Sequence, residues 1–200
     1  MKSLSEIGSV SVGDHFTFGN YPQGADGEVQ PIEWRVLAVE DGKALVISEK
    51  VLDYVQYNER DTDVTWETCT LRKWMNNDFI SKAFSSSQQA QIVTVTNQNP
   101  NNPKYGTKGG NTTQDRVFAL SIDEAKKYFS SDSDRKAFTT DYAHKKGYDQ
   151  IDRSEGWWLR SPGSDSRDAA YVGSSGYVLQ NGADVDRNYG CVRPAFWLNL

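Results

Sequence analysis

The pattern of apolar and polar positions in the first fifty residues predicts two adjacent β-strands. Residues 32–39 (IEWRVLAV) and 43–48 (KALVIS) are rich in β-branched and aromatic side chains, which favour a pleated, half-buried surface. Asp41-Gly42 lies between them and suits a two-residue type I′ turn, in which both central residues need a positive φ. We therefore predict a β-hairpin.

A helical pattern follows the hairpin. Leu71, Trp74, Met75 and Phe79 recur at three and four residues, as apolar side chains do along one face of an α-helix. The preceding threonines can cap this helix, because a hydroxyl accepts hydrogen bonds from the N–H groups of the first turn. We expect the apolar face to pack on the sheet.

Capping signals predict two shorter helices further along the chain. A capping box at 121–124 (SIDE) opens a helix over 125–129. Thr140 precedes a second helix over 141–146, and Gly147 follows it. These predictions rest on local sequence, since a cap involves only the residues around one helix end.

Residues 97–114 (NQNPNNPKYGTKGGNTTQ) contain no aliphatic side chain and one aromatic, Tyr105. Strand-like segments at 92–95 and 117–120 flank this stretch closely. We therefore predict a long surface loop rather than a linker between two cores.

Strand and turn signals return from residue 157 and end in an apolar run at 192–198. We expect this run to pair with the N-terminal strands, because unpaired β-rich ends expose bare sheet edges. Pro194 lacks an N–H and is expected at an edge or a bulge. Strands at both ends with helices between them predict an α+β fold with antiparallel sheets.

Composition and charge narrow the class of protein. The chain has 200 residues, 12% of them aromatic, which is enough for one buried core. Its formal net charge of −5 argues against a nucleic-acid partner, because nucleic-acid readers carry a basic stripe. No apolar run approaches the roughly 18 residues of a membrane span, and the first residues lack the apolar core of a signal peptide. We expect synthesis in the cytoplasm, with export as part of a phage particle or by another route.

Few side chains suggest metal or catalytic chemistry. Cys69 and Cys191 lie far apart and belong to no Cys-x-x-Cys motif or Cys/His cluster, so we expect two buried thiols. Asp184, Asp186 and Asn188 resemble the first half of a calcium loop, but alternation along a strand would point both carboxylates outward. We predict no metal and no cofactor.

The buried arginines and the valines of the C-terminal segment are expected to be structural. Arg160 and Arg193 stand in near-apolar surroundings, where arginine usually donates to carbonyls or carboxylates. A frame of valines recurs every six or seven residues and is expected to point inward: Val172, Val178, Val185 and Val192.

The composition of residues 157–200 differs from that of the rest of the chain. Residues 1–156 contain 12 lysines and 9 glutamates, and residues 157–200 contain neither. Short and ring side chains stand between the valines, as in adaptable binding loops. The candidate binding residues, expected on one face, are Ser164, Asp165, Ser166, Arg167, Asp168, Tyr171, Gly173, Ser174, Ser175, Tyr177, Leu179, Asn181, Asp184, Asp186, Arg187, Asn188 and Tyr189. Ordinary solvated hairpins would have a similar composition, so the residues alone leave both interpretations open.

Several motifs carry a resemblance to a known family. They are residues 157–163 (WWLRSPG), Ala169-Ala170, the valine and glycine frame, and residues 190–198 (GCVRPAFWL). This segment resembles the variable proteins of diversity-generating retroelements. The resemblance extends upstream, to a bacterial and phage domain family of unassigned function, through 18–23 (FGNYPQ), 32–37 (IEWRVL), 65–66 (TW), 71–76 (LRKWMN) and 117–121 (VFALS).

The resemblance implies one domain over residues 1–200 with a C-type lectin-like fold, and it makes 157–200 the diversified segment. Adenine-directed mutagenesis of AAC codons gives NNC codons, which cannot encode Lys, Glu, Gln, Met or Trp. The missing lysines and glutamates agree with this rule. Gln180 departs from it and must be fixed or separately mutated, and Trp157, Trp158 and Trp197 must belong to the scaffold.

The implied function is non-enzymatic binding of an unknown protein or cell-surface ligand, by a monomer, as a phage or bacterial receptor-binding module. Two alternatives stay open. The first is an oxidase of the formylglycine-generating type, which resembles this architecture but needs a closely spaced cysteine pair. The second is a constant structural domain of a phage or cell-envelope assembly. The calcium motifs of sugar-binding C-type lectins do not occur in the chain.

Overall fold

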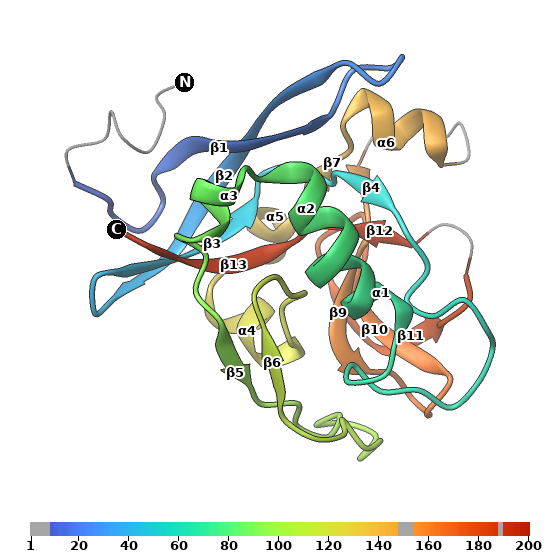
Figure 1. The fold of residues 1–200 in the computed structure, drawn as a ribbon. Helices are drawn as coiled ribbons and strands as arrows, with labels where there is room; N and C mark the ends of the chain where they lie inside the picture. Colours follow the sequence, from blue (N-terminus) through green and yellow to red (C-terminus); the bar gives the residue numbers. More distant parts are fainter. Residues whose placement is uncertain (1–8, 148–153, 188–189) are drawn as a thin grey trace.

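The structure is a computed structural model that describes residues 9–147, 154–187 and 190–200. It consists mainly of antiparallel sheets with short helices between the strands, as the α+β prediction requires. Figure 1 shows the first and last strands in one sheet, of which they form the two edges, with the sheet of residues 157–184 beside it.

The main sheet joins the first and the last strand of the described chain. Its strand order is β1 (His15–Pro22), β2 (Val29–Glu40), β3 (Lys43–Ser48) and β13 (Ala195–Asn199), and every neighbouring pair is antiparallel. The pairing of β13 with β3 confirms the expected position of the C-terminal run.

The predicted β2–β3 hairpin is present with its turn. Asp41 has a φ of 49° and Gly42 a φ of 71°, the two positive angles that a type I′ turn requires. The hairpin prediction is therefore confirmed, and β2 extends further toward the N-terminus than residues 32–39.

The second sheet contains most of the candidate binding segment. Its order is β11 (Val178–Asp184), β10 (Asp168–Val172) and β9 (Trp157–Pro162). The short β12 (Cys191–Val192) then pairs with β4 (Asp53–Tyr54). Pro194 lies between β12 and β13, where its carbonyl accepts from the Ser48 N–H at 3.0 Å. At this position, outside both strands, the missing N–H of the proline leaves no hydrogen bond of a strand unmade.

Two further strand pairs are small. They are β5 (Val95–Asn97) with β6 (Thr113–Asp115), and β7 (Ala137–Phe138) with β8 (Ser154–Glu155). The predicted strands at 92–95 and 117–120 are wrong in extent. Ile92 and Phe118 instead form single bridges to β13, because the free edge of that strand takes partners from outside the hairpin.

The apolar helical pattern produces three consecutive segments, α1 (Thr70–Trp74), a π-helical turn η2 (Met75–Phe79) and α2 (Ile80–Ala83). Its apolar face packs on the main sheet, and the ring of Phe79 lies 5.3 Å from that of Tyr21 on β1. The expected threonine cap is wrong. The Cys69 thiol accepts from the Arg72 N–H at 3.4 Å, while the Thr70 hydroxyl accepts from the Glu59 N–H.

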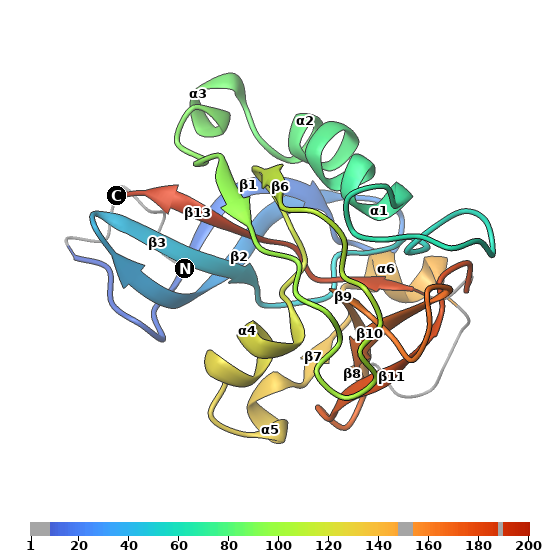
Figure 2. The same cartoon turned by 90° about the horizontal axis from the view of Figure 1, so that it is seen from below.

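The other helices are short: α3 (Ser86–Gln89), α4 (Ile122–Lys127), α5 (Asp132–Arg135) and α6 (Asp141–Lys146). The capping box of Ser121 and Glu124 and the Thr140 cap are confirmed. The first of these two helices begins at Ile122, earlier than predicted. Figure 2 shows α2 and α3 on one side of the main sheet and α4 and α5 on the other.

Aromatic rings fill the space between the main sheet and α2. Trp34 and Phe196 pack edge to face at 4.6 Å, and Phe84 lies 5.5 Å from Phe196. The Trp34 Nε1–H donates to the Phe18 carbonyl at 2.7 Å, so the buried indole keeps a hydrogen-bond partner. This core fixes the main sheet, beside which the second sheet stands.

Candidate functional site

The exposed candidate residues fall into two groups at opposite ends of the second sheet. One group follows β9 and includes residues 164–167 with Asn181 and Asp184 of β11. The other surrounds the β10–β11 turn and includes Ser174, Ser175 and Tyr177. The two ends are connected along β10, where Ala169 pairs with Ala183 and Val172 pairs with Val178.

Exposure of the candidate residues varies. The exposed ones are Ser164, Asp165, Ser166, Arg167, Ser174, Ser175, Tyr177, Asn181 and Asp184. The half-buried ones are Asp168, Tyr171, Leu179, Asp186 and Arg187. Gly173 is buried, and Asn188 and Tyr189 lie outside the described residues. Three frame valines, Val172, Val185 and Val192, are buried as predicted. Val178 is only half-buried, because β11 is the open edge of its sheet.

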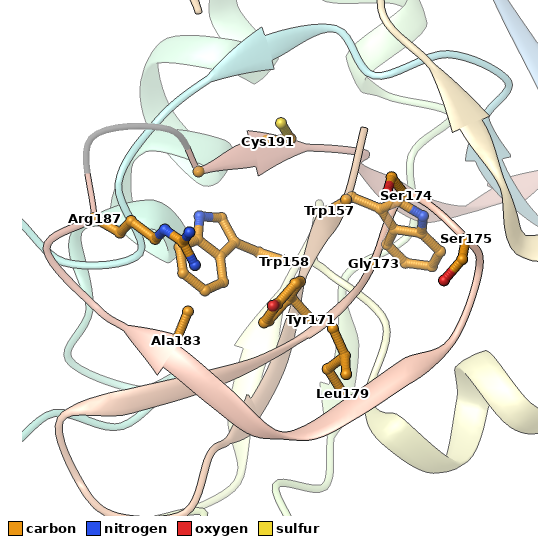
Figure 3. Close-up of a pocket in the computed structure, with 12 residues that line it drawn as sticks. Trp157, Trp158, Tyr171, Gly173, Ser174, Ser175, Leu179, Ala183, Arg187 and Cys191 are labelled. Carbon is orange, nitrogen blue, oxygen red and sulfur yellow. The ribbon is translucent and has the colours of Figure 1, made fainter. Parts of the chain in front are cut away.

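A cavity of about 280 Å³ opens beside the β10–β11 turn. We call it the aromatic pocket and divide its lining into two parts. Its floor consists of Gly156, Trp157, Trp158, Gly190 and Cys191, none of which is a candidate binding residue. Its wall consists of Tyr171, Gly173, Ser174, Ser175, Leu179, Ala183 and Arg187. Figure 3 shows Trp158 and Arg187 at one end of the pocket and Ser174 and Ser175 at the other.

The Trp158 indole is held in one orientation. Its Nε1–H donates to the Val55 carbonyl at 3.2 Å. The Tyr57 and Tyr171 rings stand edge-on to it, at 5.8 and 6.2 Å between centroids. Gly190 closes on the indole so tightly that an added Cβ would lie 1.9 Å from the Trp158 Nε1. A side chain at position 190 would therefore displace the indole.

Residues outside 157–200 hold this segment through hydrogen bonds to its main-chain carbonyls. The Asn102 Nδ2 group lies within hydrogen-bond distance of the Pro162, Gly163 and Gln180 carbonyls, at 2.8, 3.1 and 2.8 Å. The Thr107 hydroxyl donates to the Ser164 carbonyl at 2.9 Å. Both donors lie in the loop between β5 and β6, so this loop braces the second sheet.

Five more donors act in the same way. Main-chain N–H groups of Val55, Asn58 and Val64 donate to the carbonyls of Gly190, Val185 and Ser166, at 2.8, 2.9 and 3.0 Å. The Arg135 Nε–H donates to the Gly176 carbonyl at 2.9 Å, and the Gln56 amide donates to the Asp186 carbonyl. We call the seven donors the carbonyl clamp: Val55, Gln56, Asn58, Val64, Asn102, Thr107 and Arg135.

The sequence of this chain matches one known family. A family described as "Domain of unknown function (DUF6273)" matches residues 41–200. The chain belongs to the DUF6273 family. No curated protein and no solved structure gives a significant match. The DUF6273 match includes the second sheet and every donor of the carbonyl clamp. It begins after β2, so the main sheet of this DUF6273 protein also uses strands that precede the matched range.

The end of the DUF6273 domain that holds residues 164–168 is acidic. The Ser166 hydroxyl donates to Asp63 at 2.6 Å, and Arg167 lies 3.7 Å from both Asp61 and Asp63. Partial burial raises the pKa of Asp168, and the nearby carboxylates of Asp165 and Asp184 raise it further, against the lowering effect of a hydrogen bond from Ser164. The negative charge of the carboxylates at this end of the sheet is only partly balanced by Arg167.

Both predicted structural arginines have structural roles in this DUF6273 protein. Buried Arg160 donates to the Ala119 carbonyl at 3.0 Å and pairs with the Glu124 carboxylate. Arg193 donates to the Ser48 carbonyl at 2.7 Å and lies over the Trp157 ring. Burial lowers the pKa of Arg193 to about 10, so the side chain remains charged at neutral pH.

The two cysteines are free and buried, as predicted. Cys69 caps α1 and Cys191 belongs to β12. Burial raises the pKa of the Cys69 thiol to about 12. The described residues contain no group of three or more His, Cys, Asp or Glu side chains that could hold a metal ion. Among the same residues, no helix has the length and apolar character needed to cross a membrane.

Sequence reasoning missed the carbonyl clamp. Asn102 was placed in a surface loop, but its side chain is only 2% exposed. The letters around it (NPNNP) do not distinguish the buried asparagine from its exposed neighbours. The carbonyls that it meets belong to residues about sixty and eighty positions later, so no local pattern reveals them.

Proposed function

We propose that this DUF6273 protein is a non-enzymatic binding protein that displays a diversified surface to a protein or cell-surface ligand. The surface is formed by the candidate binding residues of the second sheet, and the fold is C-type lectin-like. The antiparallel main sheet, which contains the first and the last strand, supports this fold. The proposal also makes residues 157–200 the target of a diversity-generating retroelement.

The carbonyl clamp is the observation that carries the proposal. Every amino acid has a main-chain carbonyl, so a substitution at Ser164, Ser166 or Asp186 leaves the accepting group in place. Surface substitutions that break no such contact typically change stability by less than about 0.5 kcal/mol. A segment held in this way can vary its exposed side chains without losing its conformation.

The absence of lysine and glutamate from residues 157–200 supports the proposal independently. Two residues that solvated hairpins normally use are missing, although aspartate and arginine are present. The oxidase alternative receives no comparable support. A nucleophilic cysteine needs a thiolate, and burial holds the pKa of Cys69 at about 12.

A library experiment tests the displayed surface. Randomise the nine exposed candidate positions with NNC codons, and measure the fraction of variants that resist proteolysis. In a matched control library, randomise nine buried positions of the same segment, including Val172 and Val185. We expect most members of the first library to keep a Tm within a few degrees of the parent and most of the control to unfold. Equal losses in the two libraries would overturn the proposal.

Genomic sequence tests the retroelement. A reverse-transcriptase gene beside a near-repeat of the region that encodes residues 157–200, differing at adenines, is expected. A locus without such a repeat, together with a tolerant library, would favour a constant structural domain of a phage or envelope assembly.

A further inference from the structure

We propose that the aromatic pocket binds one aromatic side chain, a phenol or an indole, of the partner protein. This rests on the proposed function and specifies which chemical group of the ligand the surface captures. The cavity of about 280 Å³ is at the lower limit of small-molecule sites, which span about 300 to 1,000 Å³. It therefore suits a single protruding ring better than a larger ligand.

The lining of the pocket favours a ring. Trp158 and Tyr171 already stand edge to face, with centroids 6.2 Å apart, and aromatic pairs prefer this geometry or an offset stack. Leu179 adds an aliphatic surface on the same side of the pocket. Because the Val55 carbonyl and Gly190 hold the Trp158 indole in place, a ring can enter without first reorganising the floor.

The charge of the lining disfavours a basic side chain. None of the described residues that line the pocket is a carboxylate, and Arg187 contributes a guanidinium group. A lysine or arginine of the partner would find no carboxylate among these residues, whereas the face of an aromatic ring attracts a guanidinium. The hydroxyls of Ser174 and Ser175, at the other end, suit a phenol O–H or an indole N–H.

The floor and the wall of the pocket would have different roles in binding the ligand. The floor is set by residues outside the candidate binding set, while six wall residues belong to that set. A constant floor would keep the preference for an aromatic ring in every variant. A changing wall would decide which ring, in which surroundings, is accepted. Aromatic side chains commonly dominate the binding energy of protein interfaces.

A titration without any partner protein tests the pocket. Record the indole Nε1–H resonances of the full chain, assigned with Trp158→Phe. Titrate with N-acetyl-tyrosinamide and N-acetyl-tryptophanamide, and as comparison probes with N-acetyl-lysinamide and methyl α-mannoside. We expect saturable shifts of the Trp158 signal with the two aromatic amides, with a dissociation constant on the order of 1 mM, and none with the comparison probes.

Two matched variants locate the site. Ser175→Phe places a ring in the pocket, while Ser81→Phe makes the same change at an exposed position of α2, outside the candidate binding residues and the pocket. We expect at least tenfold weaker binding of the amides in Ser175→Phe and unchanged binding in Ser81→Phe. Absence of aromatic binding, equal binding of the comparison probes, or an unaffected Ser175→Phe would each overturn the assignment.

The outcome is separable from that of the library experiment. A chain that tolerates the library but binds no aromatic amide disproves the pocket alone. A chain that binds the amides at Trp158 but does not tolerate the library disproves the displayed surface, and the pocket would then be a small-molecule site.

Discussion

Asn102 is the buried residue through which the β5–β6 loop holds the candidate site. Its amide group lies within hydrogen-bond distance of three carbonyls of the second sheet, and its oxygen accepts from the N–H groups of Lys104 and Tyr105 at 2.9 and 3.0 Å. The side chain thus folds the loop tip onto itself and onto the segment that it braces.

We expect Asn102→Ala to destabilise the protein by about 3 kcal/mol, because several buried polar groups lose their partners. Urea denaturation measures the change. Asn101→Ala is the control, since that exposed side chain makes one 3.3 Å contact with the Gly109 N–H, and it should cost less than about 1 kcal/mol. Similar losses in both variants would show that Asn102 braces nothing in particular.

The raised pKa of Asp168 predicts a pH-dependent effect. A carboxyl group whose pKa is higher in the folded protein favours folding when protonated, so its contribution is lost as the pH rises through the folded-state pKa. Asp168→Asn should therefore raise stability at pH 7 by about 0.3 kcal/mol, a small value because the side chain is largely solvated, and should have no effect at pH 3. Thermal unfolding at the two pH values tests this. A loss of stability at pH 7 would show that the Ser164 hydrogen bond dominates over the surrounding carboxylates.

At the scale of elements, two turns with left-handed glycines provide a matched pair. Gly42 of the β2–β3 turn has a φ of 71° and open space around it, while Gly176 of the β10–β11 turn has a φ of 88°. A Cβ on Gly176 would lie 1.7 Å from the Asp132 carbonyl oxygen of α5. The second turn is therefore packed against a helix as well as conformationally restricted.

Gly42→Ala should cost about 1 kcal/mol through backbone strain alone. Gly176→Ala should cost at least about 2 kcal/mol more, because the methyl group also forces the turn away from α5 and from the Arg135 side chain. Chemical denaturation of the two variants gives the difference directly. Equal costs would mean that the turn and α5 separate easily, and the clamp would have no anchor at that end.

The elements that could be predicted are those whose signals are local. The Asp41-Gly42 turn, the Ser121 capping box and the Thr140 cap are each specified by a few adjacent residues. The cap of α1 could not be predicted, because the Thr70 hydroxyl accepts from the Glu59 N–H in the loop after β4 and a thiol is an unusual substitute. The strands at 95–97 and 113–115 were missed because their sequences are polar.

At the scale of the whole molecule, long-range pairing determines the rest. Candidate binding residues could be chosen from composition, but their division between two ends of a sheet follows from the β9–β10–β11 order. The pocket joins wall residues with Trp158 and Gly190, which the sequence identifies only as frame. The clamp donors, from Val55 to Arg135, carry no pattern of their own.

The same long-range pairing makes the last strand essential. A chain that ends at residue 190 lacks β12 and β13, which leaves β4 unpaired and leaves β3 as an open edge paired only with β2. It also removes Phe196 from the aromatic core. We expect this truncated chain to lack a cooperative thermal transition. Removing only Leu200, an exposed residue whose N–H donates to the Gly42 carbonyl, should cost less than about 1.5 kcal/mol. A folded product ending at residue 190 would contradict the role of β13.

Under the proposed function, the position of β13 after the last candidate binding residue has a consequence for the quality of a variant population. Ribosomes reach β13 only after they have read every codon for the candidate binding residues. A premature stop or a shifted reading frame among those codons would therefore yield a chain without β13, which exposes the aromatic core to proteases. Substituted but in-frame variants would keep the strand and fold. Because of this order of elements along the chain, proteolysis would remove truncated and frameshifted variants before they encounter a ligand.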